Sequence, residues 1–294
     1  MADFDINILG CGSALPTTRH LATSQIVDLR DNLYMIDCGE GTQVQMRRMR
    51  VRFGRLAHIF ISHLHGDHCF GLPGLISTLG MLGRTGELVV HGPKEVETYL
   101  RPVMDLFCRG MEFEVRFNPV DTRSHSLVME DRSLSVYSIP LKHRIPTCGY
   151  LFAEKTDFYQ VPVRCMKDIK QGQDYVAPEG EVVPNSRLTR PAAPPKRYAF
   201  CSDTAYNRSI IPIIEGADLL YHEATFAECD LARAKETFHS TARQAAEIAR
   251  DAHVKRLVIG HYSARYEDLA ELHREAEAVF PGTILGNEGT VIPV

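Results

Sequence analysis

The sequence HLHGDH at residues 63–68 places four metal-ligand side chains within six positions. It directly follows the apolar run HIFIS at residues 58–62, which is typical of a β-strand. A packed core has no need of four such groups on one loop, whereas metal ions bind imidazole and carboxylate groups directly. The chain is therefore expected to fold so that the end of this strand forms part of a metal site.

Composition places the chain among soluble globular proteins. Its 294 residues are 44% hydrophobic and 24% charged, and they suffice for one large α/β domain or two small ones. No apolar run approaches the roughly 20 residues that cross a bilayer, so no membrane association is expected. The acidic N-terminus lacks the basic and apolar regions of a signal peptide, which predicts a cytoplasmic location. The net charge of −4 argues against broad nucleic-acid affinity but allows a local basic patch.

The eight cysteines are scattered singly, and none form a C-x-x-C pair. A disulfide framework is not expected in a chain of this size without a secretory signal. The cysteines are therefore predicted to be free thiols, most of them buried. Cys69 follows His68 directly, and its side chain should point away from that of its neighbour.

Short β-branched runs alternate with helical stretches, which predicts mixed sheets flanked by helices. Strands are predicted at Ile6–Leu9, Gln25–Asp28, Leu33–Asp37, Ile59–Ser62, Leu88–His91, Glu112–Phe117, Leu134–Ile139, Tyr198–Ser202, Leu219–His222 and Arg256–Gly260. Helices are predicted at Thr42–Arg50, Gly71–Leu82, Lys94–Cys108, Asn207–Glu215, Thr241–Ala252 and Glu267–Val279. Ser240 and Thr241 offer hydroxyl caps, and Gln244 follows near the third helical position.

The segment Lys155–Lys196 stands apart because it holds six prolines and little periodicity. It is predicted to be a long excursion between two strands of a single domain that spans residues 1–294. Its basic residues are Arg164, Lys167, Lys170, Arg187, Arg190, Lys196 and Arg197. Contact with phosphates and a merely solvated loop are both open interpretations of this charge.

Further candidate ligands follow other apolar strands, within a residue or two of the strand end. His143, Asp203 and His261 each have this position, and strands that end on one edge of a sheet can bring them together. The full candidate set is His63, His65, Asp67, His68, His143, Asp203 and His261. Seven ligands exceed the three or four that one zinc takes, but they suit two metals that share a carboxylate. Imidazole and carboxylate without thiolate favour zinc, with manganese or iron as alternatives.

The 63–68 sequence resembles the signature of the metallo-β-lactamase superfamily. More narrowly, nearly the whole chain resembles the tRNase Z (ribonuclease Z) family. The matching segments are DCGEGTQ at 37–43, GDHCFGLPGL at 66–75, PLKHR at 140–144 followed by Gly149 and Tyr150, SDT at 202–204, HEATF at 222–226, HST at 239–241 and GHYSARY at 260–266.

The resemblance implies an αβ/βα sandwich with two mixed sheets, two Zn²⁺ per subunit and a homodimer. It implies an endonuclease that removes the 3′ trailer of precursor tRNA. By position, His63, His65 and His143 would bind the first metal, Asp67, His68 and His261 the second, and Asp203 would bridge them. Asp67 would accept a proton from the attacking water. His239 is the candidate proton donor to the leaving 3′-oxygen, with Glu223 orienting its ring.

The chain departs from the family at three places. Ser202 stands where a glycine is usual, the loop PTTRHL at 16–21 lacks the family's basic pattern, and the helical part of the 155–196 segment is shortened. That segment would be a reduced tRNA-binding arm. Two alternatives stay open: a hydrolase of the same fold acting on a small molecule, such as a phosphodiesterase, and a non-catalytic module with saturated metal coordination.

Overall fold

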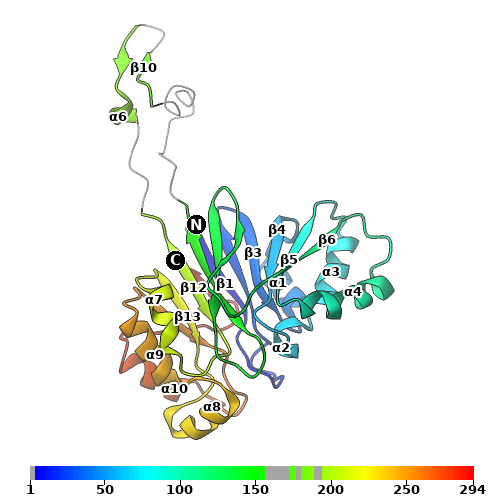
Figure 1. Cartoon of the computed structure of the whole chain (residues 1–294), viewed down its shortest axis with the longest axis vertical. Helices are drawn as coiled ribbons and strands as arrows, with labels where there is room; N and C mark the ends of the chain where they lie inside the picture. Colours follow the sequence, from blue (N-terminus) through cyan, green and yellow to red (C-terminus); the bar gives the residue numbers. More distant parts are fainter. Residues whose placement is uncertain (1–3, 156–171, 177–179, 189–193) are drawn as a thin grey trace.

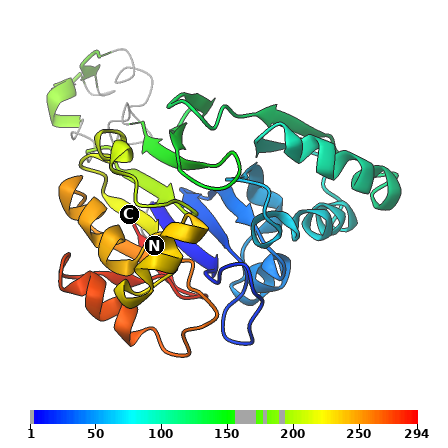
Figure 2. The ribbon, with the colours of Figure 1, turned by 60° about the horizontal axis from the view of Figure 1, so that its bottom comes forward.

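The structure, a computed structural model, describes residues 4–155, 172–176, 180–188 and 194–294. Two seven-stranded sheets lie face to face, and helices cover their outer sides (Figure 1). Figure 2 shows the same layers from below, with the two helical groups on opposite sides of the paired sheets. This arrangement is the αβ/βα sandwich of two mixed sheets that the sequence predicted.

The first sheet contains the N-terminal strands and the last strand of the chain. Its order is β16 (Val291–Pro293), β1 (Phe4–Gly10), β2 (Ser24–Leu29), β3 (Asn32–Cys38), β4 (Leu56–Phe60), β5 (Leu88–Gly92) and β6 (Val115–Pro119). Strands β16 to β3 pair antiparallel, whereas β3 to β6 pair parallel. The last strand, β16, therefore forms the edge of this sheet and pairs with the first strand, β1.

The second sheet has the same division into a parallel and an antiparallel half. Its order is β15 (Ile284–Leu285), β14 (Leu257–Gly260), β13 (Leu219–Glu223), β12 (Arg197–Cys201), β9 (Cys148–Glu154), β8 (Leu134–Pro140) and β7 (Leu127–Glu130). Strands β15 to β12 are parallel, and β12 to β7 are antiparallel. The carboxyl ends of parallel strands from both sheets thus become available on one side of the molecule.

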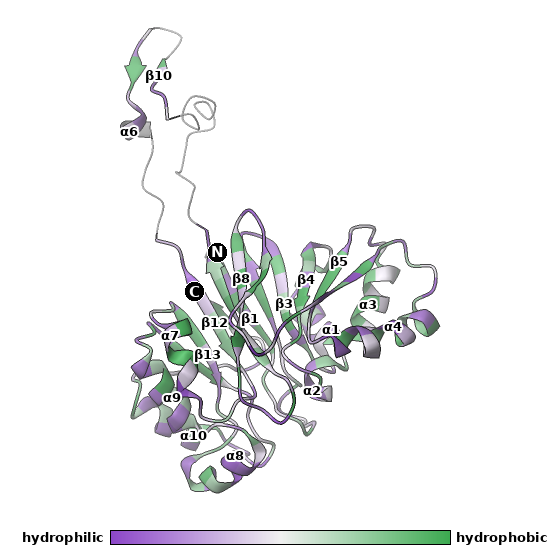
Figure 3. Ribbon diagram, in the orientation of Figure 1, coloured by the Kyte–Doolittle hydropathy of each residue, from purple (hydrophilic) through white to green (hydrophobic). Residues whose placement is uncertain are grey.

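Each sheet has its own group of helices. Beside the first sheet lie α1 (Thr42–Arg48), α2 (Gly66–Cys69), α3 (Leu72–Met81) and α4 (Glu95–Phe107). Beside the second lie α7 (Ile211–Ile214), α8 (Leu231–Thr237), α9 (Ala242–Asp251) and α10 (Ala270–Glu277). Figure 3 shows apolar residues along the central strands and hydrophilic residues on the outer helices. No helix within the described ranges is long and apolar enough to cross a membrane.

Alternation along the strands divides the core into two apolar layers. On β1, Ile8 belongs to the layer between the sheets, and its neighbour Leu9 faces the helices of the first sheet. Phe60 and Ile59 on β4 divide in the same way. Where both faces of a strand are buried, as at Ile8–Leu9 and Ile59–Phe60, apolar residues follow one another in the sequence.

The predicted elements agree with the structure in position but not at every end. The helix predicted at Asn207–Glu215 is instead a 3₁₀ turn, Arg208–Ile210, followed by the single turn of α7. The strand predicted at Glu112–Phe117 begins only at Val115. Strands β7, β9, β15 and β16 and helices α2 and α8 were not predicted. The capping box at Thr241 and Gln244 is confirmed.

The 155–196 segment is described only in part. It contains β10 (Tyr175–Val176), paired antiparallel with β11 (Val182–Val183), and α6 (Asn185–Leu188). These elements extend away from the two sheets (Figure 1). The predicted basic residues Arg164, Lys167, Lys170 and Arg190 lie outside the described residues. Of the eight cysteines, seven are described; all are free thiols, and only Cys229 is exposed.

Candidate metal centre

The seven candidate ligands converge at the carboxyl ends of strands from both sheets. His63 and His65 follow β4, Asp67 and His68 lie in the short helix α2, and His143, Asp203 and His261 follow β8, β12 and β14. Close backbone contact brings the segment after β3 against α2. A Cβ at Gly71 would lie 2.2 Å from the carbonyl oxygen of Gly39, so neither segment could approach the other with a larger residue there.

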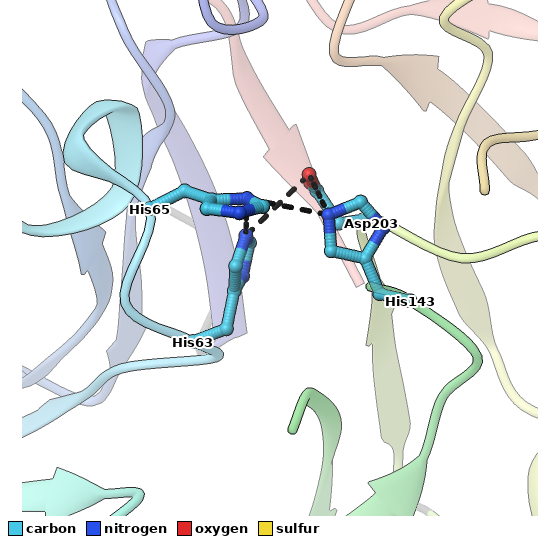
Figure 4. Close-up of side chains that lie close together, drawn as sticks. All are labelled: His63, His65, His143 and Asp203. Atoms are coloured by element: carbon cyan, nitrogen blue, oxygen red, sulfur yellow. Dashed lines mark hydrogen bonds and ion pairs between the residues drawn. The ribbon is translucent and has the colours of Figure 1, made fainter. Parts of the chain in front are cut away.

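Three histidines and one carboxylate oxygen form the first cluster (Figure 4). His65 Nδ1 lies 2.9 Å from His63 Nε2 and 3.3 Å from His143 Nε2. Asp203 Oδ2 lies 3.5 Å from His63 Nε2 and 3.6 Å from His143 Nε2. Ligand atoms around a tetrahedral zinc at about 2.0–2.1 Å stand at comparable separations.

Asp67, His68 and His261 form the second cluster around the other oxygen of the same aspartate. Asp203 Oδ1 lies 3.2 Å from His68 Nε2 and 3.1 Å from His261 Nε2. Asp67 Oδ2 lies 3.4 and 3.5 Å from the same two nitrogens. Among the residues that the structure describes, neither of these buried nitrogens has a hydrogen-bond partner, as expected for atoms that bind an ion.

Asp203 lies between the clusters and turns one oxygen towards each. Its backbone has φ of +57°, in the left-handed region that non-glycine residues seldom adopt. His261 has φ of +60°, so two of the seven residues occupy this unusual conformation. The hydroxyl of Ser202 donates to Asp203 Oδ1 at 3.0 Å. The serine that replaces the usual glycine therefore helps to hold the shared carboxylate.

Hydrogen bonds behind the clusters fix the imidazole rings. His143 Nδ1 donates to the carbonyl oxygen of Phe238 at 3.1 Å, and His261 Nδ1 lies 2.9 Å from Thr225 Oγ1. These contacts leave Nε2 of each ring free to face the cluster. Such partners orient metal-binding histidines in general.

Asp37 lies behind the second cluster, and the sequence predicted no role for it beyond its place in the DCGEGTQ segment. Its carboxylate is fully buried and accepts hydrogen bonds from Ser62 N at 2.8 Å and from Ser62 Oγ at 2.9 Å. It also accepts one from His68 Nδ1 at 2.7 Å. It lies near the carboxyl end of β3, after the apolar residues of that strand, and this position was the signal available in the sequence.

The buried carboxylates around the two clusters favour positive charge nearby. Burial opposes protonation of His68, yet Asp203, Asp67 and Asp37 together raise its pKa well above the usual range. Burial and the charge of His68 lower the pKa of His63. A divalent cation supplies this positive charge without protonating any imidazole.

His239 and Glu223 form a separate pair beside the clusters. Glu223 Oε1 accepts hydrogen bonds from His239 Nδ1 at 2.9 Å and from Thr204 N at 2.6 Å. Burial by itself lowers the pKa of His239, but the charge and hydrogen bond of Glu223 outweigh burial and raise it to about 9. The His239 ring centroid lies 5.0 Å from that of His143 and 5.4 Å from that of His261. The pair can therefore hold a proton next to both clusters.

Thr225 connects this pair to the second cluster and was also missed as a site residue. Its hydroxyl donates to Glu223 Oε2 at 2.5 Å and lies 2.9 Å from His261 Nδ1. It is 3% exposed. Only its place in the HEATF segment, two residues after Glu223, could have indicated it.

The fold and the paired clusters define a hydrolase of the metallo-β-lactamase fold. A solved metallo-β-lactamase fold protein from Bacillus subtilis superposes with a TM-score of 0.70 at 17% identity and covers 98% of both chains. The chain belongs to the ribonuclease Z family, and it is an enzyme. A ribonuclease Z from Parabacteroides distasonis is 79% identical over an alignment of 304 residues that covers all of both chains. The crystal structure of human tRNase Z, short form, is 26% identical with a TM-score of 0.74, covering 99% of this chain and all of that one.

A family model described as Anti-Pycsar protein Apyc1 matches residues 4–98. The matched segment contains the ligand candidates of residues 63–68 and the end of β3. His143, Asp203 and His261 lie beyond it, as do Glu223 and His239. The match therefore covers only the part of the centre that the first sheet supplies.

Proposed function

We propose that this enzyme removes the 3′ trailer of precursor tRNA with the aid of two Zn²⁺ per subunit. The observation that carries the proposal is the pair of ligand clusters that share Asp203, with the Glu223–His239 pair beside them. The names of the relatives support the substrate class, because they are ribonuclease Z and tRNase Z. We also propose the metal roles predicted for the seven residues: His63, His65 and His143 for the first ion, Asp67, His68 and His261 for the second, and Asp203 for both.

Zinc fits the donor set better than other common ions. The clusters offer imidazole and carboxylate groups without thiolate, since Cys69 Sγ donates to the carbonyl oxygen of His65 instead. When bound, two such ions supply a hydroxide near neutral pH and polarise a phosphodiester oxygen. Manganese or iron would suit the same ligands and are tested by reconstitution.

Asp67 is proposed to hold the attacking water and accept its proton. Its carboxylate belongs to the second cluster, and its side chain is 8% exposed, so it borders both the ligands and solvent. Burial alone would raise its pKa, but the charge of His68 and the contact with His261 keep that pKa below the ordinary range. It is therefore ionised and able to accept a hydrogen bond from water.

His239 is proposed to donate a proton to the leaving 3′-oxygen. Glu223 keeps the imidazole protonated and fixes it through Nδ1, which leaves Nε2 as the donating atom. Glu223 is itself held by the backbone N–H groups of Thr204 and Ser240. General acid catalysis of this kind contributes typically about 10²–10⁴-fold.

The 155–196 segment is proposed to contact tRNA phosphates as a reduced arm. Two of the basic residues predicted to serve this segment, Lys196 at its end and Arg197 at the start of β12, already contact the body of the protein. Lys196 Nζ donates to the carbonyl oxygen of Val294, and Arg197 donates to those of Glu215 and Ile213. Phosphate contact would therefore depend on the other basic residues predicted for the segment. The homodimer and the cytoplasmic location are further predictions, the first of which light scattering would test.

The decisive experiment incubates the zinc-loaded enzyme with a precursor tRNA and maps the 3′ end of the product. Cleavage at the junction with the trailer is the expected result. Bis-p-nitrophenyl phosphate and a cyclic nucleotide serve as parallel substrates for the alternative of a small-molecule phosphodiesterase. Turnover of either small substrate with an uncut precursor would favour that alternative, and an inert loaded protein would favour a binding module.

A further inference from the structure

Cys11, His20 and Glu288 form a third group of ligand-type side chains, outside the centre described above. Their ligand atoms lie within 4.8 Å of one another. Cys11 Sγ lies 3.4 Å from His20 Nδ1, and the same nitrogen lies 3.0 Å from Glu288 Oε2. Cys11 follows β1, His20 lies in the loop before β2, and Glu288 precedes β16, so three distant segments of the chain meet here.

One ring nitrogen faces both the thiol and the carboxylate. In a nucleophilic triad the base uses two different nitrogens, one for the nucleophile and one for the orienting acid. Convergence on a single nitrogen is instead the arrangement of ligands around one ion. A tetrahedral zinc with Zn–S of about 2.3 Å and Zn–N of about 2.0–2.1 Å separates such atoms by roughly 3.3–3.6 Å. The observed 3.4 and 3.0 Å require only small adjustments.

The surroundings hold the three groups in place and leave one side open. The second oxygen of Glu288, Oε1, accepts a hydrogen bond from Leu21 N at 2.7 Å, which turns Oε2 towards the histidine. The carbonyl oxygen of Cys11 accepts one from Tyr262 N at 2.9 Å. Cys11 is fully buried, whereas the side chains of His20 and Glu288 are 17% and 14% exposed. An ion could therefore enter from solvent and keep a water as its fourth ligand.

We propose that Cys11, His20 and Glu288 bind a third divalent ion, zinc, that is separate from the two-metal centre. Binding releases the thiol proton and any proton on His20 Nδ1, so that a thiolate, a neutral imidazole and a carboxylate face the ion. The two negative charges balance the charge of the ion. The bound ion ties the end of β1 to the loop before β2 and to the C-terminal segment.

The competing arrangement is a hydrogen-bonded trio without metal. In that arrangement the thiol and the imidazole N–H would both donate to the Glu288 carboxylate, and burial together with that carboxylate would keep the pKa of the Cys11 thiol well above its usual range. A bond between the Cys11 thiolate and a metal distinguishes the metal site from the metal-free trio experimentally. The seven ligand candidates of the two-metal centre are nitrogen and oxygen donors, so a thiolate–metal bond would report on the third site alone.

The test titrates the metal-free full-length chain with Co²⁺ under a reductant that does not bind metals. The expected result is a third bound equivalent that brings a thiolate-to-cobalt charge-transfer band in the near ultraviolet. Cys11→Ser should abolish the band and keep two equivalents, and Glu288→Gln should weaken it strongly in a chain that keeps the thiol. Cys229→Ser, which changes the exposed thiol, should keep the band at full intensity.

Two results would overturn the proposal. One is a wild-type chain that binds only two equivalents and shows no charge-transfer band. The other is a band that persists unchanged in Cys11→Ser or disappears in Cys229→Ser. Native mass spectrometry of the zinc-loaded chain gives a second count of ions that does not depend on cobalt.

Discussion

His239 shows how one buried carboxylate sets the state of a neighbouring ring. Glu223 is fully buried, and its hydrogen bonds to His239, Thr204 and Ser240 compensate for the lost hydration of its charge. None of the seven clustered ligands is needed to hold this pair. Removal of the imidazole should therefore affect the reaction and leave the metal sites intact.

We expect His239→Ala to lower the rate of precursor cleavage by about 10²–10⁴-fold, the usual contribution of a general acid. Its metal content should equal that of the wild type. Single-turnover cleavage and elemental analysis of the same preparation check both statements. The matched control is His253→Asn, an exposed histidine at the end of α9 with φ of +52°, which asparagine tolerates. Wild-type turnover in His239→Ala would remove this residue from the mechanism.

The shared carboxylate predicts a difference between two ligand substitutions. Asp203 turns an oxygen towards each cluster, whereas His143 faces only the first. Asp203→Ala should therefore lower the occupancy of both ions, and His143→Ala should lower that of one. Both variants should lose activity. Metal counting by native mass spectrometry distinguishes them, and equal losses would contradict the bridging role.

Thr225 should act as a positioning residue for His261. Thr225→Val keeps the shape but removes the hydroxyl, and we expect metal affinity at the second cluster to fall about 10–100-fold. Thr225→Ser keeps the hydroxyl and should restore most of the affinity. Competition with a chromophoric chelator measures the effect, and equal affinities in the two variants would assign Thr225 a packing role only.

The sequence predicted seven candidate ligands because each lies in a recognisable segment that follows a strand. Asp37, Thr225 and the Cys11–His20–Glu288 group escaped prediction for a different reason. Their roles depend on hydrogen bonds and proximities between segments far apart in the chain, such as the 277 positions between Cys11 and Glu288. Position in a motif was the available signal for Asp37 and Thr225, but no local pattern encodes the pairing of Cys11 with Glu288.

At the scale of elements, β4 and β5 place two histidines in the apolar layer between the sheets. His58 Nδ1 lies 3.0 Å from His91 Nε2, and Asn118 Nδ2 on β6 donates to His91 Nδ1 at 2.9 Å. The His91 ring stacks on Phe60 at 4.4 Å between centroids. Burial, with the nearby His58 and Arg116, lowers the pKa of His91 from 6.5 to about 3.

This shift makes the folded state sensitive to acid. Between pH 6.5 and about 3 the unfolded chain binds a proton on His91 that the folded chain does not bind. Stability is therefore fully present above pH 6.5 and falls as the pH drops, by at most about 1.4 kcal/mol per pH unit from this group. His91→Gln should reduce the slope of the unfolding free energy against pH by up to the equivalent of one bound proton. Urea unfolding at neutral and mildly acidic pH measures both slopes, and identical slopes would contradict the assignment.

Element boundaries could be predicted only where a local signal exists. The capping box at Thr241 and Gln244 marks the start of α9 in both the sequence and the structure. In contrast, α2 is a single turn whose residues serve as ligand candidates, and its length gives no helical period to detect. Strand β9 is buried on both faces, so it shows no alternation of apolar and polar residues, and Gly149 weakens its β-propensity.

At the scale of the whole molecule, deleting part of the 155–196 segment tests whether this segment contributes to substrate binding. Deletion of Gln160–Pro184 should weaken the binding of precursor tRNA and reduce the salt dependence of that binding, because fewer phosphates would be neutralised. Hydrolysis of bis-p-nitrophenyl phosphate should be unchanged, since the metal centre lies at the ends of the sheets. Filter binding at several salt concentrations measures the first effect. Unchanged tRNA affinity would show that the segment is only a solvated loop.

Each cluster takes its members from both sheets. His63 and His65 come from the first sheet, and His143 comes from the second; the other cluster is divided in the same way. An ion bound in either cluster would link the two sheets directly, because its ligands come from both. A motion that separates the two sheets at the edge that carries the clusters would weaken the binding of both ions. Retention of metal therefore reports whether the two sheets stay together at this edge.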